Sequence, residues 1–137
     1  MRLYSVVPTP VRRATQDYVV PGHPKFVIEK NTSILIPSFA IHHDPEIYPN
    51  PNEFNPDNFE PSKVVARDSV TWLPFGDGPR NCIGLRFGQM QTRLGIAILL
   101  KDYKFLPCDS TQIPVKIDKS HHLCINEGGI NLKVEKV

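Results

Sequence analysis

The sequence predicts an α+β fold with one long helix, several short strands and much irregular chain. Apolar residues recur every three or four positions between residues 84 and 100, which is the period of an amphipathic helix. Short β-rich runs flank this segment and predict small β-sheets. Nine of the fourteen Pro residues lie at 8–24 and 45–61. Because Pro breaks helices and removes a hydrogen-bond donor, these stretches are predicted to form turns and loops.

Four of the β-rich runs are predicted to be strands. Residues 26–29 and 33–36 are expected to pair as a hairpin around a turn at 30–32. Two later strands are predicted at 103–106 and 130–134, the second from its alternation of apolar and polar residues.

Between the predicted hairpin and the long helix, the sequence predicts only short or irregular structure. Ser38 is expected to cap a short helix that ends at His42. The Pro- and Asn-rich loop that follows is expected to be held in place by Phe54 and Phe59. Residues 63–71 are predicted to be a polar linker.

Composition excludes several classes of function. A length of 137 residues allows one domain or part of one, and a hydrophobic content of 40% excludes a disordered chain. The net charge of +2 is too small to indicate nucleic-acid binding. No apolar run is long enough to span a bilayer or to serve as a signal peptide. Three Cys do not make a disulfide framework, and they favour a reducing compartment.

Chemistry is expected in the stretch from Phe75 to Gly84, which reads FGDGPRNCIG. Its glycines and proline predict a tight loop that delivers Cys82 just before the long helix. A sulfur at a helix N-terminus faces unpaired N–H groups and the positive end of the helix dipole, and both favour the thiolate over the thiol. Arg80 adds a positive charge two residues away.

A thiolate beside one Arg and a flat apolar surface suits a haem. The sulfur of Cys82 would bind the iron, and Arg80 would pair with a propionate through a charge-assisted hydrogen bond. Phe75 is expected to shield the sulfur, and Gly84 to let a large flat group approach the start of the helix. The loop therefore predicts a haem-thiolate centre.

With this loop in view, the chain resembles the cytochrome P450 superfamily. The haem loop of that family reads F-x-x-G-x-R-x-C-x-G, and Phe75, Gly78, Arg80, Cys82 and Gly84 fill every specified position. A chance match has odds on the order of one in millions per starting position, so the motif is specific.

The resemblance implies a mainly α fold with small β-sheets (α+β). Residues 1–137 would be the C-terminal, haem-binding fragment of a single domain, with the haem loop at 75–84 and a helix at about 84–100. The implied cofactor is haem b, an iron protoporphyrin, with Cys82 as the catalytic residue and axial iron ligand. The other expected haem contacts are Arg80, Arg12, Phe75, Gly76, Ile83, Gly84 and Gly88. The residues expected to contact substrate are Val7, Thr9 and Leu123.

The resemblance also implies an activity and partners. The expected function is a haem-dependent monooxygenase that inserts one oxygen atom of O2 into a small lipophilic substrate, with electrons from an NADPH-cytochrome reductase. Arg86 and Lys104 are candidates for the reductase surface, although a solvated basic surface explains each as well. The full-length protein is expected at the cytoplasmic face of the endoplasmic reticulum membrane, held by an N-terminal anchor that this chain lacks. Nucleic acid is not expected as a partner.

Two further segments resemble family motifs. Arg2 resembles the Arg of an E-x-x-R motif, whose Glu would precede Met1. Pro56–Phe59 resembles P-x-R-F, but Asn58 stands where the family has Arg, so the family's three-residue salt-bridge network is in question here. The segment Arg86–Gln91 is most similar to the insect microsomal branch.

Two other functions remain open from the sequence. Without the oxygen-activating segment of the family, the 137 residues alone would be a non-catalytic haem-binding module. The pairs His42-His43 and His121-His122, the second close to Cys124, raise a zinc-binding interaction domain, although their spacing matches no tight zinc pattern. The chain alone is expected to fold poorly, because haem would supply much of its core.

Overall fold

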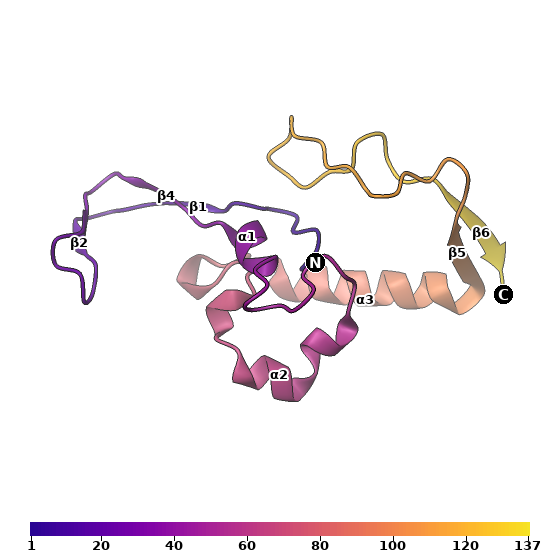
Figure 1. Ribbon diagram of the computed structural model, residues 1–137, viewed down its shortest axis with the longest axis horizontal. Coiled ribbons are helices and arrows are strands. Elements are labelled where there is room, and N and C mark those ends of the chain that lie inside the picture. Colours follow the sequence, from indigo (N-terminus) through magenta and orange to yellow (C-terminus); the bar gives the residue numbers. More distant parts are fainter. The chain divides into compact units, whose positions relative to one another are not determined.

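The computed structural model describes all residues 1–137, which form two compact units, Met1–Pro74 and Phe75–Val137. Most of the chain lies outside helices and strands, and α3 (Leu85–Asp102) is the one long helix (Figure 1). The predicted α+β class is therefore confirmed, with irregular chain rather than helix as the larger part. None of the helices combines the length and the apolar character needed to cross a bilayer.

The first unit begins with two nested antiparallel pairs of short strands. The outer pair joins β1 (Val11–Arg13) to β4 (Ser33–Leu35), and the inner pair joins β2 (Tyr18–Val19) to β3 (Val27–Ile28). Each pair is a separate two-stranded sheet. The segment therefore folds back on itself once, as one long irregular hairpin.

The predicted hairpin between 26–29 and 33–36 is wrong. Both runs contain strands, but each pairs with an earlier strand of the chain. The turn between them is a corner that faces residue 14: Asn31 adopts a φ of 71° and donates its N–H to the Ala14 carbonyl at 2.8 Å. Ala14 in turn donates to the Thr32 carbonyl at 2.9 Å. The backbone groups of Asn31 and Thr32 therefore form hydrogen bonds with Ala14, just after β1.

Short helices follow the strands in the first unit. The helix predicted to end at His42 is confirmed as α1 (Ser38–His42), but Ser38 does not cap it. The Ser38 hydroxyl donates instead to the carbonyls of Val7 and Pro8, at 3.2 and 2.9 Å. Ser38 therefore ties α1 to the segment before β1.

The predicted linker at 63–71 is wrong, because α2 (Pro61–Ala66) enters it and a 3-10 turn at Ser69–Thr71 ends it. A second 3-10 turn at Pro56–Phe59 precedes α2. Of the two predicted anchors, Phe59 packs against Trp72 with ring centroids 5.2 Å apart, whereas Phe54 is 85% exposed.

The interior of the first unit is largely polar, and His42 lies at its centre. His42 is fully buried, and its Nε2 accepts a hydrogen bond from the Leu73 N–H at 2.8 Å. The proton of the neutral ring must then be on Nδ1, which lies 2.8 Å from the Ser5 hydroxyl and donates to it. One side chain thereby joins residue 5, α1 and the chain that leads to Phe75.

Burial makes His42 a source of acid sensitivity. Desolvation, followed by the neighbouring His43 and Arg2, lowers the pKa of His42 from 6.5 to about 4. The unfolded chain therefore takes up a proton at a higher pH than the folded chain does. The stability is present above pH 6.5 and is lost as the pH falls towards 4, by at most about 3 kcal/mol.

This pH dependence is tested by urea unfolding of the full-length protein between pH 7 and pH 4. His42→Gln should be less stable at pH 7 and should show a flatter loss of stability with falling pH. His23→Gln, at an exposed position, should keep the slope of the wild type. Equal slopes for all three proteins would contradict the assignment of His42 as the titrating group.

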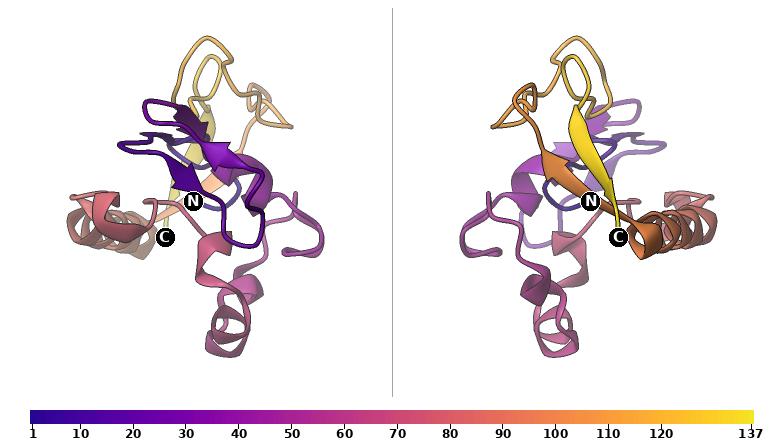
Figure 2. Two further views of the ribbon diagram at one scale, coloured as in Figure 1. Left: turned by 90° about the vertical axis from the view of Figure 1, so that its left-hand side faces the viewer. Right: turned by 90° about the vertical axis from the view of Figure 1, so that its right-hand side faces the viewer.

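The second unit contains α3 and one antiparallel pair of strands. β5 (Tyr103–Pro107) follows α3 directly and pairs with β6 (Leu132–Lys136), which lies beside it in Figure 2. The predicted helix at about 84–100 and both predicted late strands are thus confirmed, with α3 ending two residues later and β6 beginning two residues later than predicted. The region between the strands is irregular, apart from a bridge between Ile117 and Asn126.

The apolar side of α3 is exposed rather than packed. The periodic residues that predicted the helix are between 57% and 63% exposed, namely Phe87, Met90, Leu94 and Ile98. No residue of α3 is buried, and β5 is the element of the unit that packs against it. The apolar side of the amphipathic helix is therefore not covered by other residues of this unit.

Candidate functional site

The candidate site is the loop from Phe75 to Gly84 that leads into α3. Gly76 and Gly78 have φ values of 72° and 75°, a conformation that side chains with a Cβ rarely adopt. The Cys82 N–H donates to the Phe75 carbonyl at 2.8 Å and closes the loop. The predicted tight loop is thus confirmed, and its glycines are required by the backbone.

Cys82 is the exposed cysteine of the chain, and it stands at the start of α3. Its carbonyl accepts the N–H of Leu85, the first residue of the helix, at 3.2 Å. Gly84 occupies the N-cap position and offers no side-chain cap. The first turn of α3 therefore keeps unpaired N–H groups near the sulfur, and this end of a helix favours negative charge.

Gly84 and Gly88 keep the surroundings of the sulfur open. A Cβ at Gly84 would lie 3.8 Å from the Cys82 Sγ. A Cβ at Gly88 would lie 3.5 Å from Cε1 of the Phe75 ring, which rests over this turn of α3. The Phe75 ring therefore packs on the first turns of the helix and lies directly over Gly88.

The spacing at Gly88 gives a prediction about side-chain size. Gly88→Ala places a methyl group in ordinary contact with Phe75 and should stabilise α3 by up to about 1 kcal/mol, because Ala is the better helix former. Gly88→Val adds two more methyl groups, displaces Phe75, and should lower stability by about 1–3 kcal/mol. Thermal unfolding and haem content of the full-length variants measure both effects.

Gly95 provides the matched control, because a Cβ there meets nothing within 4 Å. Gly95→Ala and Gly95→Val should differ only by helix propensity, by a few tenths of a kcal/mol. If the Ala-to-Val difference is the same at both positions, the contact between Gly88 and Phe75 does not restrict the site.

Arg80 and Ile83 flank Cys82 on the loop. Arg80 ends a 3-10 turn at Gly78–Arg80, whose N-cap Asp77 accepts the Gly78 N–H at 2.8 Å. Ile83 is fully exposed, which is unusual for so large an apolar side chain. The loop thus presents a sulfur, a cation and an apolar side chain within four residues.

The other residues predicted for the site lie outside this loop. Val7, Thr9 and Arg12 belong to the first unit, where Arg12 lies in β1 and its guanidinium donates to the Val11 carbonyl at 3.0 Å. Leu123 is exposed in the irregular region between β5 and β6. The structure therefore gathers the loop residues and Gly88, and the four outlying residues stay predictions.

The remaining two cysteines are held by local interactions. Hydrogen bonds with Ser110 and Thr111 lower the pKa of Cys108, and burial raises the pKa of Cys124. Cys108 also lies in a turn that the Thr111 N–H closes by donating to the Cys108 carbonyl at 2.8 Å, and the Thr111 hydroxyl donates to the Asn131 carbonyl at 2.5 Å. Both cysteines are therefore parts of the irregular region rather than of the loop at Cys82.

The histidines that raised a zinc site have other roles. Both ring nitrogens of His42 are engaged in hydrogen bonds, and His121 lies 3.2 Å from the Asp118 carboxylate on an exposed turn. No group of three or more His, Cys, Asp or Glu side chains is arranged to hold a metal ion.

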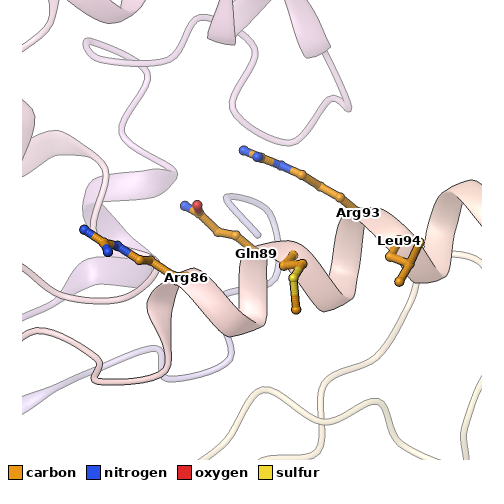
Figure 3. Close-up of a pocket in the computed structure, with 5 residues that line it drawn as sticks. Arg86, Gln89, Arg93 and Leu94 are labelled. Carbon is orange, nitrogen blue, oxygen red and sulfur yellow. The ribbon is translucent and has the colours of Figure 1, made fainter.

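A hollow of about 500 Å³ lies along α3, and Arg86 is the lining residue for which the sequence predicted a role in binding a partner. Figure 3 shows Arg86, Gln89 and Arg93 projecting from one side of the helix, with Leu94 pointing away from them. Their spacing of three and four residues is the signal that places them on one face. Arg86 was a candidate for a partner surface, whereas Gln89 and Arg93 were not.

The amino-acid sequence of the chain matches a known family over nearly its whole length. A family model described as Cytochrome P450 matches residues 1–134. The chain belongs to the cytochrome P450 family. Among the similar curated proteins are two of Drosophila melanogaster, "Probable cytochrome P450 6a21" and "Cytochrome P450 6a9", each 57% identical over the whole chain. "Cytochrome P450 6A1" of Musca domestica is 48% identical over 92% of the chain.

These relatives place the chain in the insect branch of cytochrome P450 that contains the 6a proteins, which confirms the predicted branch. The chain spans about a quarter of the length of the curated relatives it matches, 27% for the Drosophila proteins and 25% for the Musca protein.

For a member of the cytochrome P450 family, the question is whether the loop could hold a haem. An exposed sulfur at a helix N-terminus is a suitable ligand for iron, and Ile83 beside it offers apolar surface to a porphyrin. Gly84 has no side chain next to the sulfur, so a flat group can approach the start of α3 there. The residues present therefore fit a haem bound through Cys82.

Proposed function

We propose that residues 1–137 form the C-terminal, haem-binding part of a single domain, and that Cys82 is the axial ligand of the haem iron. The observation that carries this proposal is the exposed Cys82 sulfur in a loop that its own backbone N–H closes onto Phe75, at the start of α3. The thiolate is the form of the side chain that binds iron.

The residues around the sulfur divide between holding the haem and protecting the thiolate. Arg80, and Arg12 of the first unit, pair with the haem propionates through charge-assisted hydrogen bonds. Phe75 packs on the first turns of α3 and covers one side of the loop that presents the sulfur. The remaining haem contacts are Gly76, Ile83, Gly84 and Gly88.

The activity that follows is a monooxygenase reaction. When bound, haem b supplies the metal at which one atom of O2 is inserted into a C–H bond of the substrate, while the other atom leaves as water with the uptake of two electrons and two protons. Cys82 would hold the iron through its sulfur and would supply electron density to it. The two electrons come from NADPH through a partner reductase.

The exposed apolar side of α3 supports a larger domain around these residues. Phe87, Met90, Leu94 and Ile98 leave more than half of each side chain in water, which a stable domain of this size avoids. The haem and further chain of a protein of the relatives' length cover this side. The whole protein then provides the distal half of the haem pocket.

The substrate is a small lipophilic molecule. Val7, Thr9 and Leu123 are exposed, and two of the three are apolar, as a lipophilic ligand requires.

Arg86 and Lys104 contribute basic surface to the reductase interface. The protein acts at the cytoplasmic face of the endoplasmic reticulum, where an N-terminal anchor holds it.

Reconstitution of the full-length protein with an NADPH-cytochrome reductase and lipid vesicles tests the activity. A panel of small lipophilic compounds should yield hydroxylated products that require both NADPH and O2, with oxygen-18 from O2 in the product. Haem bound through Cys82 without any such product would instead support a non-catalytic haem-binding protein.

A further inference from the structure

Two guanidinium groups lie over one aromatic ring in the first unit. The Cζ of Arg67 lies 4.6 Å from the centre of the Tyr48 ring, and the Cζ of Arg2 lies 5.0 Å from the same centre. Tyr48 is fully buried, and its hydroxyl donates to the Thr71 carbonyl at 3.0 Å. At these distances a cation is attracted to the face of the ring, more strongly where water is excluded.

Arg67 reaches this ring from the end of α2 and also contacts the 3-10 turn before that helix. Its guanidinium donates to the Asn58 carbonyl and lies 5.4 Å from the centre of the Phe59 ring. Phe59 in turn packs against Trp72. Phe59, Arg67 and Trp72 are among the residues that line a hollow of about 240 Å³.

Asn58, whose carbonyl Arg67 contacts, has a neutral side chain and adds no positive charge to this cluster. Its side chain is only 7% exposed, and its buried Nδ2 has no hydrogen-bond partner, which carries a cost in stability. Neither Arg2 nor Arg67 forms an ion pair, since the ion pairs of the chain lie elsewhere. The two cations are therefore held by backbone carbonyls and aromatic rings.

We propose that Arg67 is a positioning residue that holds Tyr48 in place together with Arg2. Arg67 thereby provides the second guanidinium of this cluster, which Asn58 cannot provide. Through Tyr48, Thr71 and Trp72, this contact orients the segment that enters the haem loop at Phe75. The functional consequence rests on the proposed haem site, whereas the contact itself does not.

Three variants of the full-length holoprotein test this role. Arg67→Ala should lower the unfolding midpoint by about 2 °C or more and should speed haem loss several-fold. Lys63→Ala, which removes another long cationic side chain from the exposed face of α2, should behave as the wild type. Adding Asn58→Arg to Arg67→Ala should restore at least half of the loss, because the Arg67 guanidinium contacts residue 58 and an Arg there returns a cation to the same cluster.

The proposal is overturned if Arg67→Ala matches Lys63→Ala, or if Asn58→Arg restores nothing in a folded double variant. Should that double variant fail to fold, a cycle with Tyr48→Leu decides. The losses from Arg67→Ala and Tyr48→Leu should be clearly less than additive, and additive losses overturn the proposal.

Unfolding midpoints from far-ultraviolet circular dichroism do not depend on how the haem is bound. If the wild type lacks a thiolate-bound haem, the proposed function fails while the Arg67 result keeps its meaning.

Discussion

Replacing Cys82 with Ser in the full-length protein is expected to abolish monooxygenase turnover, by a factor of at least about 100. A Ser hydroxyl stays protonated at neutral pH, so it offers the iron no anionic ligand and little electron density. The substitution exchanges one exposed sulfur for an oxygen, so the backbone of the loop, which the Cys82 N–H closes onto Phe75, should persist. Turnover per haem, measured after reconstitution with the reductase, separates loss of chemistry from loss of cofactor.

Cys108→Ser is the matched control for this variant. Cys108 is another free cysteine, and its contacts with Ser110 and Thr111 are hydrogen bonds that a hydroxyl can replace. Its turnover should equal that of the wild type. If Cys82→Ser retains turnover per haem, or if the control loses it equally, the special role of Cys82 is refuted.

The largest loss of stability is expected for Arg2→Ala. Arg2 is 5% exposed, and its guanidinium donates to the carbonyls of His42, Pro51 and Glu53 at 2.8, 2.6 and 2.9 Å. Truncation leaves these acceptors without their partner and also removes the contact with Tyr48. Hydrogen bonds to charged groups are among the stronger ones, so the free energy of unfolding should fall by about 3–5 kcal/mol.

Urea unfolding of the full-length protein measures this loss, with Arg13→Ala as the control at an exposed position. Arg2→Lys should recover only part of the stability, because an ammonium group lacks the planar fork that reaches three carbonyls. A loss below 1 kcal/mol for Arg2→Ala would show that the three carbonyls find other donors and that Arg2 does not organise this unit.

Local patterns predicted the elements on which the proposed site depends. The helix at 84–100 follows from apolar spacing, and α3 occupies this stretch. The tight loop before it follows from Gly76 and Gly78, which adopt backbone angles that favour glycine. Both features are set by neighbours in the sequence, which explains why sequence alone was sufficient to predict them.

The pairing of the early strands was predicted wrongly, because it depends on contacts between residues that are distant in the sequence. The run at 26–29 has the composition of a strand, but composition does not tell it to pair with residues 18–19 rather than with 33–36. Likewise, nothing near Arg67 indicates that its side chain reaches Tyr48, nineteen positions earlier, and a buried His42 looks in sequence like a metal ligand.

The reduced full-length holoprotein, treated with carbon monoxide, provides the most direct test of the central claim that the Cys82 thiolate binds the haem iron. A thiolate opposite carbon monoxide shifts the Soret band strongly to the red, and the account predicts this band for the wild type and its absence in Cys82→Ser. A haem-loaded wild type without the shifted band, or a Cys82→Ser variant that keeps it, would contradict the account.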